Sequence, residues 1–175
     1  LFPDKENILE GYCNIFFEEK ILAELDSNNL KKTKYIIEKP ILYNNNQRLN
    51  SFEKCEKIFH SIMNDIYIVL NKTHHVNWQK KSWEILIGHW LKRFIWIVFF
   101  KYQNIQNIFN KYKISNVFLS SSDNNEVASH ETWQIYNLSI DKEWSWILSS
   151  KIIEYIDNSK LTFDKSIIII FFDLG

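Results

Sequence analysis

The chain has 175 residues, of which 46% are hydrophobic, and its 21 Lys and Arg residues balance 21 Asp and Glu residues. This length is typical of one domain with a sizeable core, and zero net charge argues against a dedicated nucleic-acid binder or a polybasic membrane protein. With two cysteines and no secretory signal, the sequence predicts a reducing, cytoplasmic location rather than an extracellular disulfide scaffold.

The first segment, residues 1–48, has no clear hydrophobic period, and we expect irregular α/β structure there. A helix is expected over residues 15–25. Short apolar runs at residues 35–37 and 41–43, on either side of Pro40, are typical of strands.

Residues 49–112 are expected to be helical. Between residues 51 and 70, apolar side chains recur at steps of three and four, which places them on one helical face. Asn50 can cap the start of this helix, and the Glu53 carboxylate lies where it can interact with the positive helix end. The repeating residues are Phe52, Cys55, Phe59, Ile62, Ile66 and Val69.

A second helix is predicted to start near Lys81, and its apolar surface extends almost all round, which indicates a central position. Helical spacing continues through residues 102–112, either in the same helix or after a bend at the junction. Because His89, Lys92 and Arg93 interrupt the apolar stretch, no transmembrane helix is expected. The apolar face contains Trp83, Ile87, Trp90, Leu91, Phe94 and Val98.

Residues 113–175 are expected to form a βαβ-like unit. Strands are predicted at residues 114–119 and 167–172, with a helix over residues 141–156 between them. A buried parallel strand is normally followed by a crossover helix, yet the chain ends directly after the second strand, and it begins without an initiator Met. We therefore expect an N-terminal fragment whose C-terminal domain is missing.

His74 and His75 lie in a polar junction between the two predicted helices, where imidazoles could transfer protons or bind substrate. Adjacent histidines on a helix point about 100° apart, and the sequence has no His-Glu-x-x-His or Cys-x-x-Cys spacing, so no metal site is expected. The structural alternative is a loop histidine that hydrogen-bonds a helix end.

A narrow polar stripe interrupts the central helix. Glu84, Gly88 and Lys92 share one row at a spacing of four residues, and His89 and Arg93 share the next row. An unpaired buried cation is too costly, so these side chains either form an ion-pair network or contact an anionic ligand. Both interpretations remain open, and the glycine could allow another backbone or a ligand to approach.

The polar loop at residues 120–126 follows a predicted strand but has no Gly-x-Ser-x-Gly motif to support a serine nucleophile. Ligands in open α/β sheets bind beyond the carboxyl ends of strands, so Ser121 and Asn124 are candidate substrate-binding residues. Most of the seven tryptophans should be core residues. Those expected to be partly exposed, and so able to stack on a ring, are Trp78, Trp133 and Trp146.

One block of the sequence contains Leu70-Asn71, Ser82-Trp83 and Trp90-Leu91, and a second contains Asp141 and residues 144–153. These two blocks resemble a transferase family of bacterial lipopolysaccharide O-antigen and other surface-polysaccharide loci. The resemblance extends over about residues 60–156. It departs from the family pattern at His89, where the family has Pro, at Lys81-Ser82, and at residues 99–102, which lack an Asp-Arg pair. The first block contains Leu70-Asn71, His74 or His75, Ser82-Trp83, residues 85–88, Trp90-Leu91 and Phe94, and the second contains residues 125–133, Asp141 and residues 144–153.

The resemblance implies a helix-rich α/β fold that forms the partial Rossmann-like N-terminal half of a GT-B-like glycosyltransferase. It implies a nucleotide-sugar donor, bound mainly by the missing C-terminal domain, and a glycan or lipid-linked acceptor. We expect no cofactor in this segment and no nucleic-acid partner. The location is expected to be cytoplasmic, with peripheral attachment to the inner membrane left open. The alternative function is a non-catalytic helical scaffold or protein-interaction domain.

Within this hypothesis, His75 and Arg93 are the predicted catalytic residues, with the imidazole as general base and the guanidinium stabilising the departing diphosphate. The predicted substrate-binding residues are His74, Lys92, Ser121, Asn124, Trp78 and Trp133.

Overall fold

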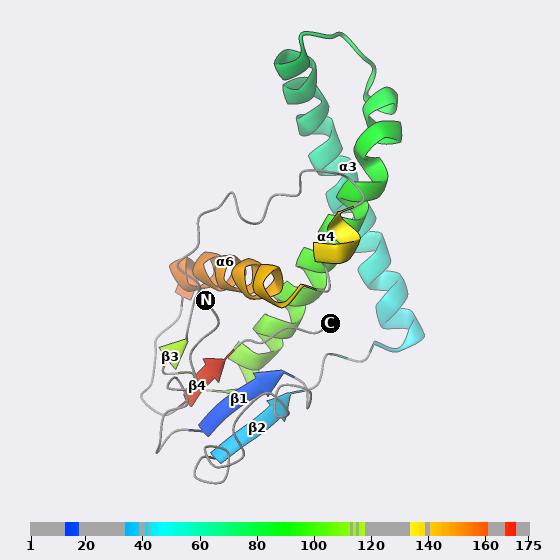
Figure 1. Ribbon diagram of the computed structural model, residues 1–175. Helices are drawn as coiled ribbons and strands as arrows, with labels where there is room; N and C mark the ends of the chain where they lie inside the picture. Colours follow the sequence, from blue (N-terminus) through cyan, green and yellow to red (C-terminus); the bar gives the residue numbers. More distant parts are fainter. Residues whose placement is uncertain are drawn as a thin grey trace. The chain divides into compact units, whose positions relative to one another are not determined.

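The chain divides into two compact units. The hairpin unit contains residues 42–100 and 129–135, and the sheet unit contains residues 1–41, 101–128 and 136–175. The computed structural model describes residues 13–17, 34–38, 41, 43–112, 114, 116–117, 134–138, 141–160 and 167–170 (Figure 1).

Helix α3, Asn45–His74, has 30 residues and confirms the first predicted helix. It starts earlier than expected, so the prediction of Asn50 as the cap is wrong. Asn44 and Gln47 form a capping box instead, in which each side chain accepts a hydrogen bond of 2.9 Å from the other residue's backbone N–H. The helix ends at His74, and the C-cap residue His75 has left-handed backbone angles (φ 54°, ψ 39°).

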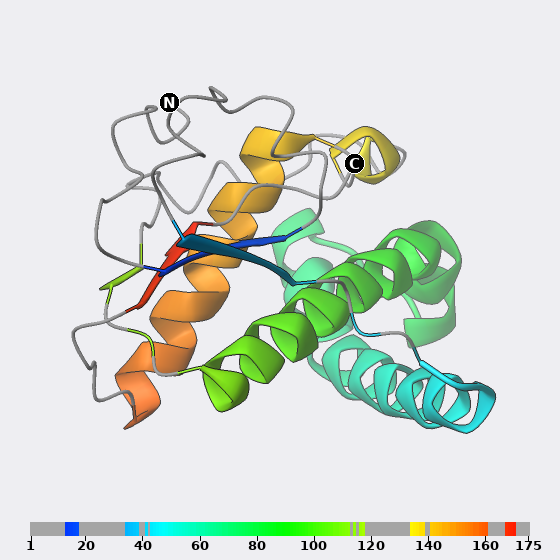
Figure 2. The same ribbon diagram turned by 90° about the horizontal axis from the view of Figure 1, so that it is seen from below.

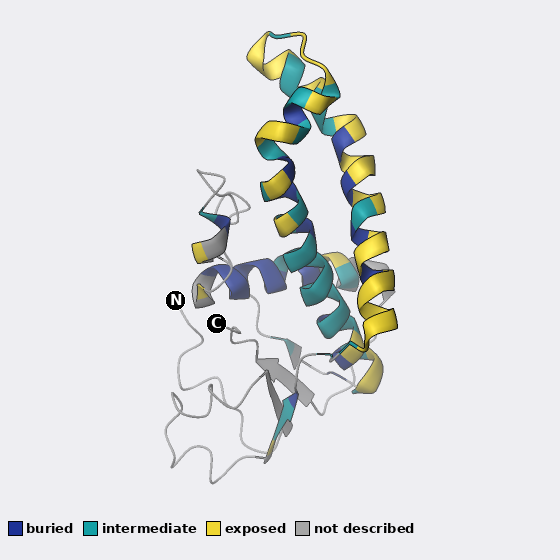
Figure 3. Ribbon diagram, turned by 90° about the vertical axis from the view of Figure 1, so that its right-hand side faces the viewer, coloured by how far each residue is buried: buried dark blue, intermediate teal, exposed yellow. Residues whose placement is uncertain are grey.

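Helix α4, Lys80–Lys111, is continuous over 32 residues, so the predicted segment at 102–112 belongs to the same helix. In the hairpin unit α4 packs against α3, and exposed residues follow the outer side of α3 (Figure 3). Phe59 lies against Gly88, where an added Cβ would be 3.5 Å from the ring. The hairpin core consists of Cys55, Phe59, Met63, Trp83, Leu91 and Ile95.

The described residues of the sheet unit include four short parallel strands in the order β2-β1-β4-β3. Strand β2 confirms the prediction at residues 35–37, whereas β1 shows that the start of the predicted helix 15–25 is wrong. Neither Ile41 nor Tyr43 belongs to a strand. The strands are β1 (Cys13–Phe17), β2 (Lys34–Glu38), β3 (Asn116–Val117) and β4 (Ile167–Ile170).

Helix α6, Lys142–Lys160, confirms the last predicted helix and covers one face of the sheet (Figures 1 and 2). Asp141, which precedes its first residue, caps it: the Asp141 carboxylate accepts a 2.7 Å hydrogen bond from the Trp144 backbone N–H. Nearly all of its side chains from Trp144 to Ile153 are buried, as the dark ribbon in Figure 3 shows. A further short helix, α5, spans Ile135–Leu138.

The expected α/β, partial Rossmann-like half of a GT-B-like architecture is wrong. A doubly wound fold alternates strands with single crossover helices that pack on the sheet. Here α3 and α4 follow each other without an intervening strand, and together they bury their apolar faces in a core of their own. Helices account for most of the described residues, and the strands have five, five, two and four residues. The described part of the chain is therefore helix-rich, and its two longest elements, α3 and α4, form a helical hairpin.

Within the described ranges, none of the helices is long and apolar enough to span a bilayer.

Candidate functional site

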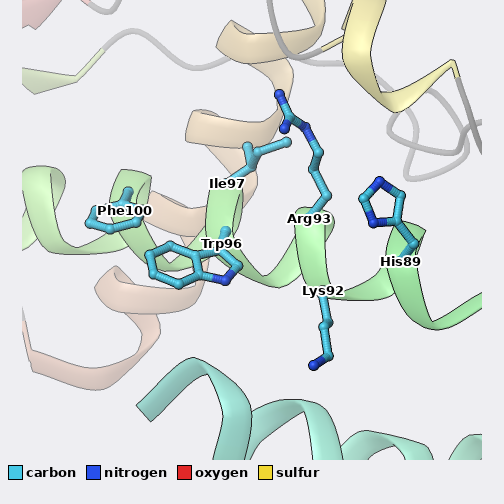
Figure 4. A pocket seen from close by; sticks show the side chains of 6 residues that line it. All are labelled: His89, Lys92, Arg93, Trp96, Ile97 and Phe100. Carbon is cyan, nitrogen blue, oxygen red and sulfur yellow. The ribbon is translucent and has the colours of Figure 1, made fainter. Parts of the chain in front are cut away.

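A groove of about 570 Å³ runs along α4 in the hairpin unit (Figure 4). Its lining residues form two rows on the helix, each with a spacing of four residues, because side chains at this spacing lie on one face. In both rows the residues nearer the hairpin tip carry nitrogen donors, and those further along the helix are apolar. One row contains His89, Arg93 and Ile97, and the other contains Lys92, Trp96 and Phe100.

Lys92 is held in place by its contacts with α3. Its ammonium group lies 2.8 Å from the Glu56 carboxylate and 4.7 Å from the centre of the Phe59 ring. The side chain points from α4 toward α3 in Figure 4 and keeps 41% of its surface exposed. Lys92 therefore links the two helices beside the groove, where the Glu56 carboxylate balances its positive charge.

His89 and Arg93 extend from the other side of α4 (Figure 4), and both residues are exposed. They lie one helical turn apart, so one anionic group can contact both side chains. Glu84 and Lys92 do not pair with each other along α4. The Glu84 carboxylate pairs with Lys81 at 3.1 Å, and Lys92 pairs with Glu56 of α3. The hydrogen bond from Lys81 lowers the pKa of Glu84 below its ordinary value.

The far end of the groove has an aromatic wall. The Trp96 ring stacks on Phe100 with centroids 5.1 Å apart and planes 25° apart, and Phe52 lies 5.8 Å away. These protein rings already pack on Trp96, so the indole serves as an apolar wall rather than an open stacking surface. None of the described residues that line the groove is acidic. The groove thus combines cationic donors at one end with apolar surface at the other.

The predicted residues His74, His75 and Trp78 lie at the hairpin tip, away from the groove. His75 is exposed at the C-cap of α3, and its backbone N–H donates to the Lys72 carbonyl oxygen at 3.4 Å. The His74 ring lies 5.5 Å from Trp83, and Trp78, 46% exposed, lies 5.1 Å from the same indole. At a rise of about 1.5 Å per residue, the start of α4 is about 20 Å from Arg93.

The structure therefore brings Lys92 and Arg93 to one groove but does not bring His75 to Arg93. Ser121, Asn124 and Trp133 lie outside the described residues, so their predicted roles stay predictions. The catalytic assignment of His75 also stays a prediction.

Sequence reasoning did not select four groove residues. The sequence places His89 in the polar stripe without assigning it a role. Trp96 is expected to be a core residue, so it is not among the predicted stacking residues. The signal was present as two rows at a spacing of four residues, both changing from polar to apolar along the helix. The residues missed are His89, Trp96, Ile97 and Phe100.

The sheet unit contains a second cluster of titratable groups, around Glu38 at the end of β2. Glu38 is buried, and both the Lys111 ammonium group and the Tyr112 hydroxyl donate hydrogen bonds to its carboxylate. Burial alone would raise the pKa of Glu38, but these hydrogen bonds outweigh it, so the pKa is below its ordinary value. The cluster connects a strand end to the end of α4 and is a structural ion pair.

No group of three or more His, Cys, Asp or Glu side chains in the described part of the chain could hold a metal ion. Cys55 is buried in the hairpin core, and burial raises the pKa of its thiol to about 11. A neutral thiol of this kind is a weak ligand and nucleophile. The prediction that the chain binds no metal stays a prediction.

Comparison with known proteins gives one match. No curated protein and no solved structure is similar enough to count as a relative of the chain. The family model described as LIC12162 family transferase matches residues 7–170, a range that includes both helices of the hairpin and all of β1, β2, β3 and β4. The transferase class implied by the sequence resemblance is thereby confirmed, and the chain belongs to the LIC12162 family of transferases.

Proposed function

We propose that this chain is part of a transferase that moves a glycosyl group during bacterial surface-polysaccharide assembly, and that the α4 groove binds one of its substrates. Family membership supports transfer chemistry. The observation that carries the choice of site is a groove on α4 that has Lys92 along one side, His89 and Arg93 along the other, and an apolar wall at its far end. Polysaccharide building blocks are commonly activated as phosphate esters, which such cations bind by charge-assisted hydrogen bonds.

In this proposal, the acceptor hydroxyl loses its proton to a general base as its oxygen bonds to the anomeric carbon of the donor. The bond from that carbon to the diphosphate oxygen breaks, and cations stabilise the charge on the leaving group. Arg93 and Lys92 carry the positive charge that stabilisation of the leaving diphosphate requires. His89 lies one turn from Arg93, so it is better placed than His75 to accept a proton from a ligand in the groove.

The donor in this proposal is a nucleotide sugar, held mainly by residues other than those of the groove. The process takes place on the cytoplasmic side, with the protein dissolved or peripheral at the inner membrane. A glycan or a lipid-linked molecule is the acceptor. Family membership supports only the transferase class, so each of these finer assignments needs its own test.

The test compares the 175-residue chain with the longest reading frame that contains it, using calorimetry against a panel of nucleotide sugars and an assay for released nucleoside diphosphate. We expect the longer protein to bind and turn over a donor. Arg93→Gln should then reduce turnover by about tenfold or more. The matched control is Arg48→Gln, because Arg48 is exposed on α3 and does not line the groove.

A second function, a protein-interaction scaffold, is favoured by exposed apolar side chains on the hairpin. Ile85 is 75% exposed, Val69 58% and Leu86 54%. Clusters of exposed apolar residues often mark interaction surfaces. If the longer protein binds no donor but forms a stoichiometric complex that Ile85→Asn abolishes, the scaffold replaces glycosyl transfer as the proposed function.

A further inference from the structure

The α4 groove separates charge from apolar surface along its length. Each of its two rows begins with donors, His89 and Arg93 in one and Lys92 in the other, and each ends in apolar side chains. The change occurs at the same level in both rows, between Arg93 and Trp96. A ligand that fills the groove therefore meets positive charge at one end and hydrocarbon or aromatic surface at the other.

This arrangement fits some phosphate ligands better than others. A sugar phosphate or a nucleotide is polar along its whole length, and its hydroxyl groups would lose hydrogen bonds to water against Ile97 and Phe100. A sugar ring could gain by stacking on Trp96, but Phe100 already stacks on that indole and Phe52 lies against it. An apolar chain gains from the same surface because it leaves water.

The dimensions also suit a chain. Phe100 lies seven positions after Arg93, which corresponds to about 10 Å of helix at about 1.5 Å per residue. The groove is therefore long enough for a short hydrocarbon segment beside Trp96, Ile97 and Phe100, while an anionic head group stays near the two exposed donors, His89 and Arg93.

We propose that the α4 groove binds an amphiphile with a phosphate head group and an apolar chain, the head group on His89 and Arg93 and the chain along Trp96, Ile97 and Phe100. This inference rests on the proposed function and revises it in one respect: the groove holds the phosphate of a lipid-linked acceptor, in place of the diphosphate that leaves from the sugar donor. The binding itself requires no turnover.

The experiment measures binding of geranyl phosphate to the full chain by calorimetry, at concentrations at which this short amphiphile remains monomeric. Glucose 1-phosphate, inorganic phosphate and geraniol are the comparison ligands, so that the head group and the chain are tested separately. We expect geranyl phosphate to bind about tenfold more tightly than each of the three. Equal or tighter binding of glucose 1-phosphate or inorganic phosphate would overturn the proposal.

Two variants locate the site. Arg93→Gln should weaken geranyl phosphate binding about tenfold, whereas Arg48→Gln should leave it within about twofold. Ile97→Asn should weaken geranyl phosphate but not inorganic phosphate, with Ile68→Asn, an exposed position on α3, as its control. His89→Gln is a further head-group variant at an exposed position, should either substitution impair folding. Equal effects of groove variants and controls would overturn the proposal.

The two proposals fail separately. If geranyl phosphate binds in the groove but the longer protein transfers no sugar, glycosyl transfer is wrong and the amphiphile site stands. If sugar transfer occurs but geranyl phosphate binds no better than glucose 1-phosphate, the amphiphile site is wrong and glycosyl transfer stands.

Discussion

The Asn71 side-chain oxygen accepts a 2.9 Å hydrogen bond from the indole Nε1–H of Trp83, which joins the end of α3 to the first turn of α4. The same oxygen accepts from the Trp78 backbone N–H at 3.1 Å, and the Asn71 amide donates to the Trp78 carbonyl oxygen at 2.9 Å. Asn71 and Trp83 both belong to the sequence block that carries the family resemblance. In this structure they close the hairpin turn.

Replacing Asn71 should therefore destabilise the hairpin. Asn71→Ala removes three hydrogen bonds, one of them to a buried indole, and we expect a loss of about 1–3 kcal/mol in the free energy of unfolding. Urea denaturation followed by circular dichroism measures it. Asn64→Ala is the matched control, because Asn64 accepts only an exposed hydrogen bond from Lys80. A loss no larger than that of the control would show that the Asn71 contacts do not stabilise the turn.

Gly88 tests the packing between the helices. An alanine Cβ there would lie 3.5 Å from Phe59, an ordinary van der Waals distance, and alanine favours helix by about 1 kcal/mol over glycine. Gly88→Ala should raise the free energy of unfolding by about 0.5–1 kcal/mol, and Gly88→Leu should lower it by about 1–3 kcal/mol through overlap with the ring. Destabilisation by alanine would mean that the site requires a closer approach than the structure shows.

The Glu38 cluster should make stability depend on pH. Hydrogen bonds from Lys111 and Tyr112 lower the folded-state pKa of Glu38 below its ordinary 4.5, so the stabilisation is present above that value and is lost as the pH falls through the folded-state pKa. We expect Glu38→Gln to reduce the loss of stability between about pH 5 and pH 3. Chemical denaturation across this range measures the difference. An unchanged pH profile in Glu38→Gln would contradict the assigned ion pair.

His75 has a backbone conformation that favours glycine. Its φ of 54° is costly for a residue with a Cβ, so His75→Gly should raise the free energy of unfolding by up to about 1 kcal/mol. His74→Gly, inside the last turn of α3, should lower it by a similar amount. Because the tip is about 20 Å along α4 from Arg93, ligand affinity in the groove should not change. A large loss of turnover in His75→Gly would instead support the catalytic role predicted from the sequence.

Hydrophobic period located the long helices because α3 and α4 each bury one continuous face. The ends were harder to place. Asn50 has the side chain of a cap, but the pair Asn44 and Gln47 satisfies two backbone N–H groups at once and extends α3 upstream. The strand β1 was mistaken for part of a helix because a short apolar run such as Ile15-Phe16-Phe17 fits either period.

The predicted fold class is wrong because the sequence pattern does not show what the two long helices pack against. Apolar faces on α3 and α4 suit helices that cover a sheet and also helices that pack on each other, and periodicity does not distinguish the two. The site was recovered in part: Lys92 and Arg93 interrupt an apolar helix and do line the groove. His75 drew attention as a reactive residue type, whereas its backbone conformation, invisible in the sequence, gives it a capping role.

The most direct test of the central claim, that the α4 groove is the ligand site, is a titration of the isoleucine-methyl-labelled chain with geranyl phosphate, observed by NMR. Ile97→Val assigns the Ile97 methyl signal. We expect that signal to shift in a saturable manner, while the exposed Ile68 methyl on α3 stays in place, and we expect Arg93→Gln to weaken the response. An unchanged Ile97 signal at ligand saturation, or an equal shift at Ile68, would contradict the account.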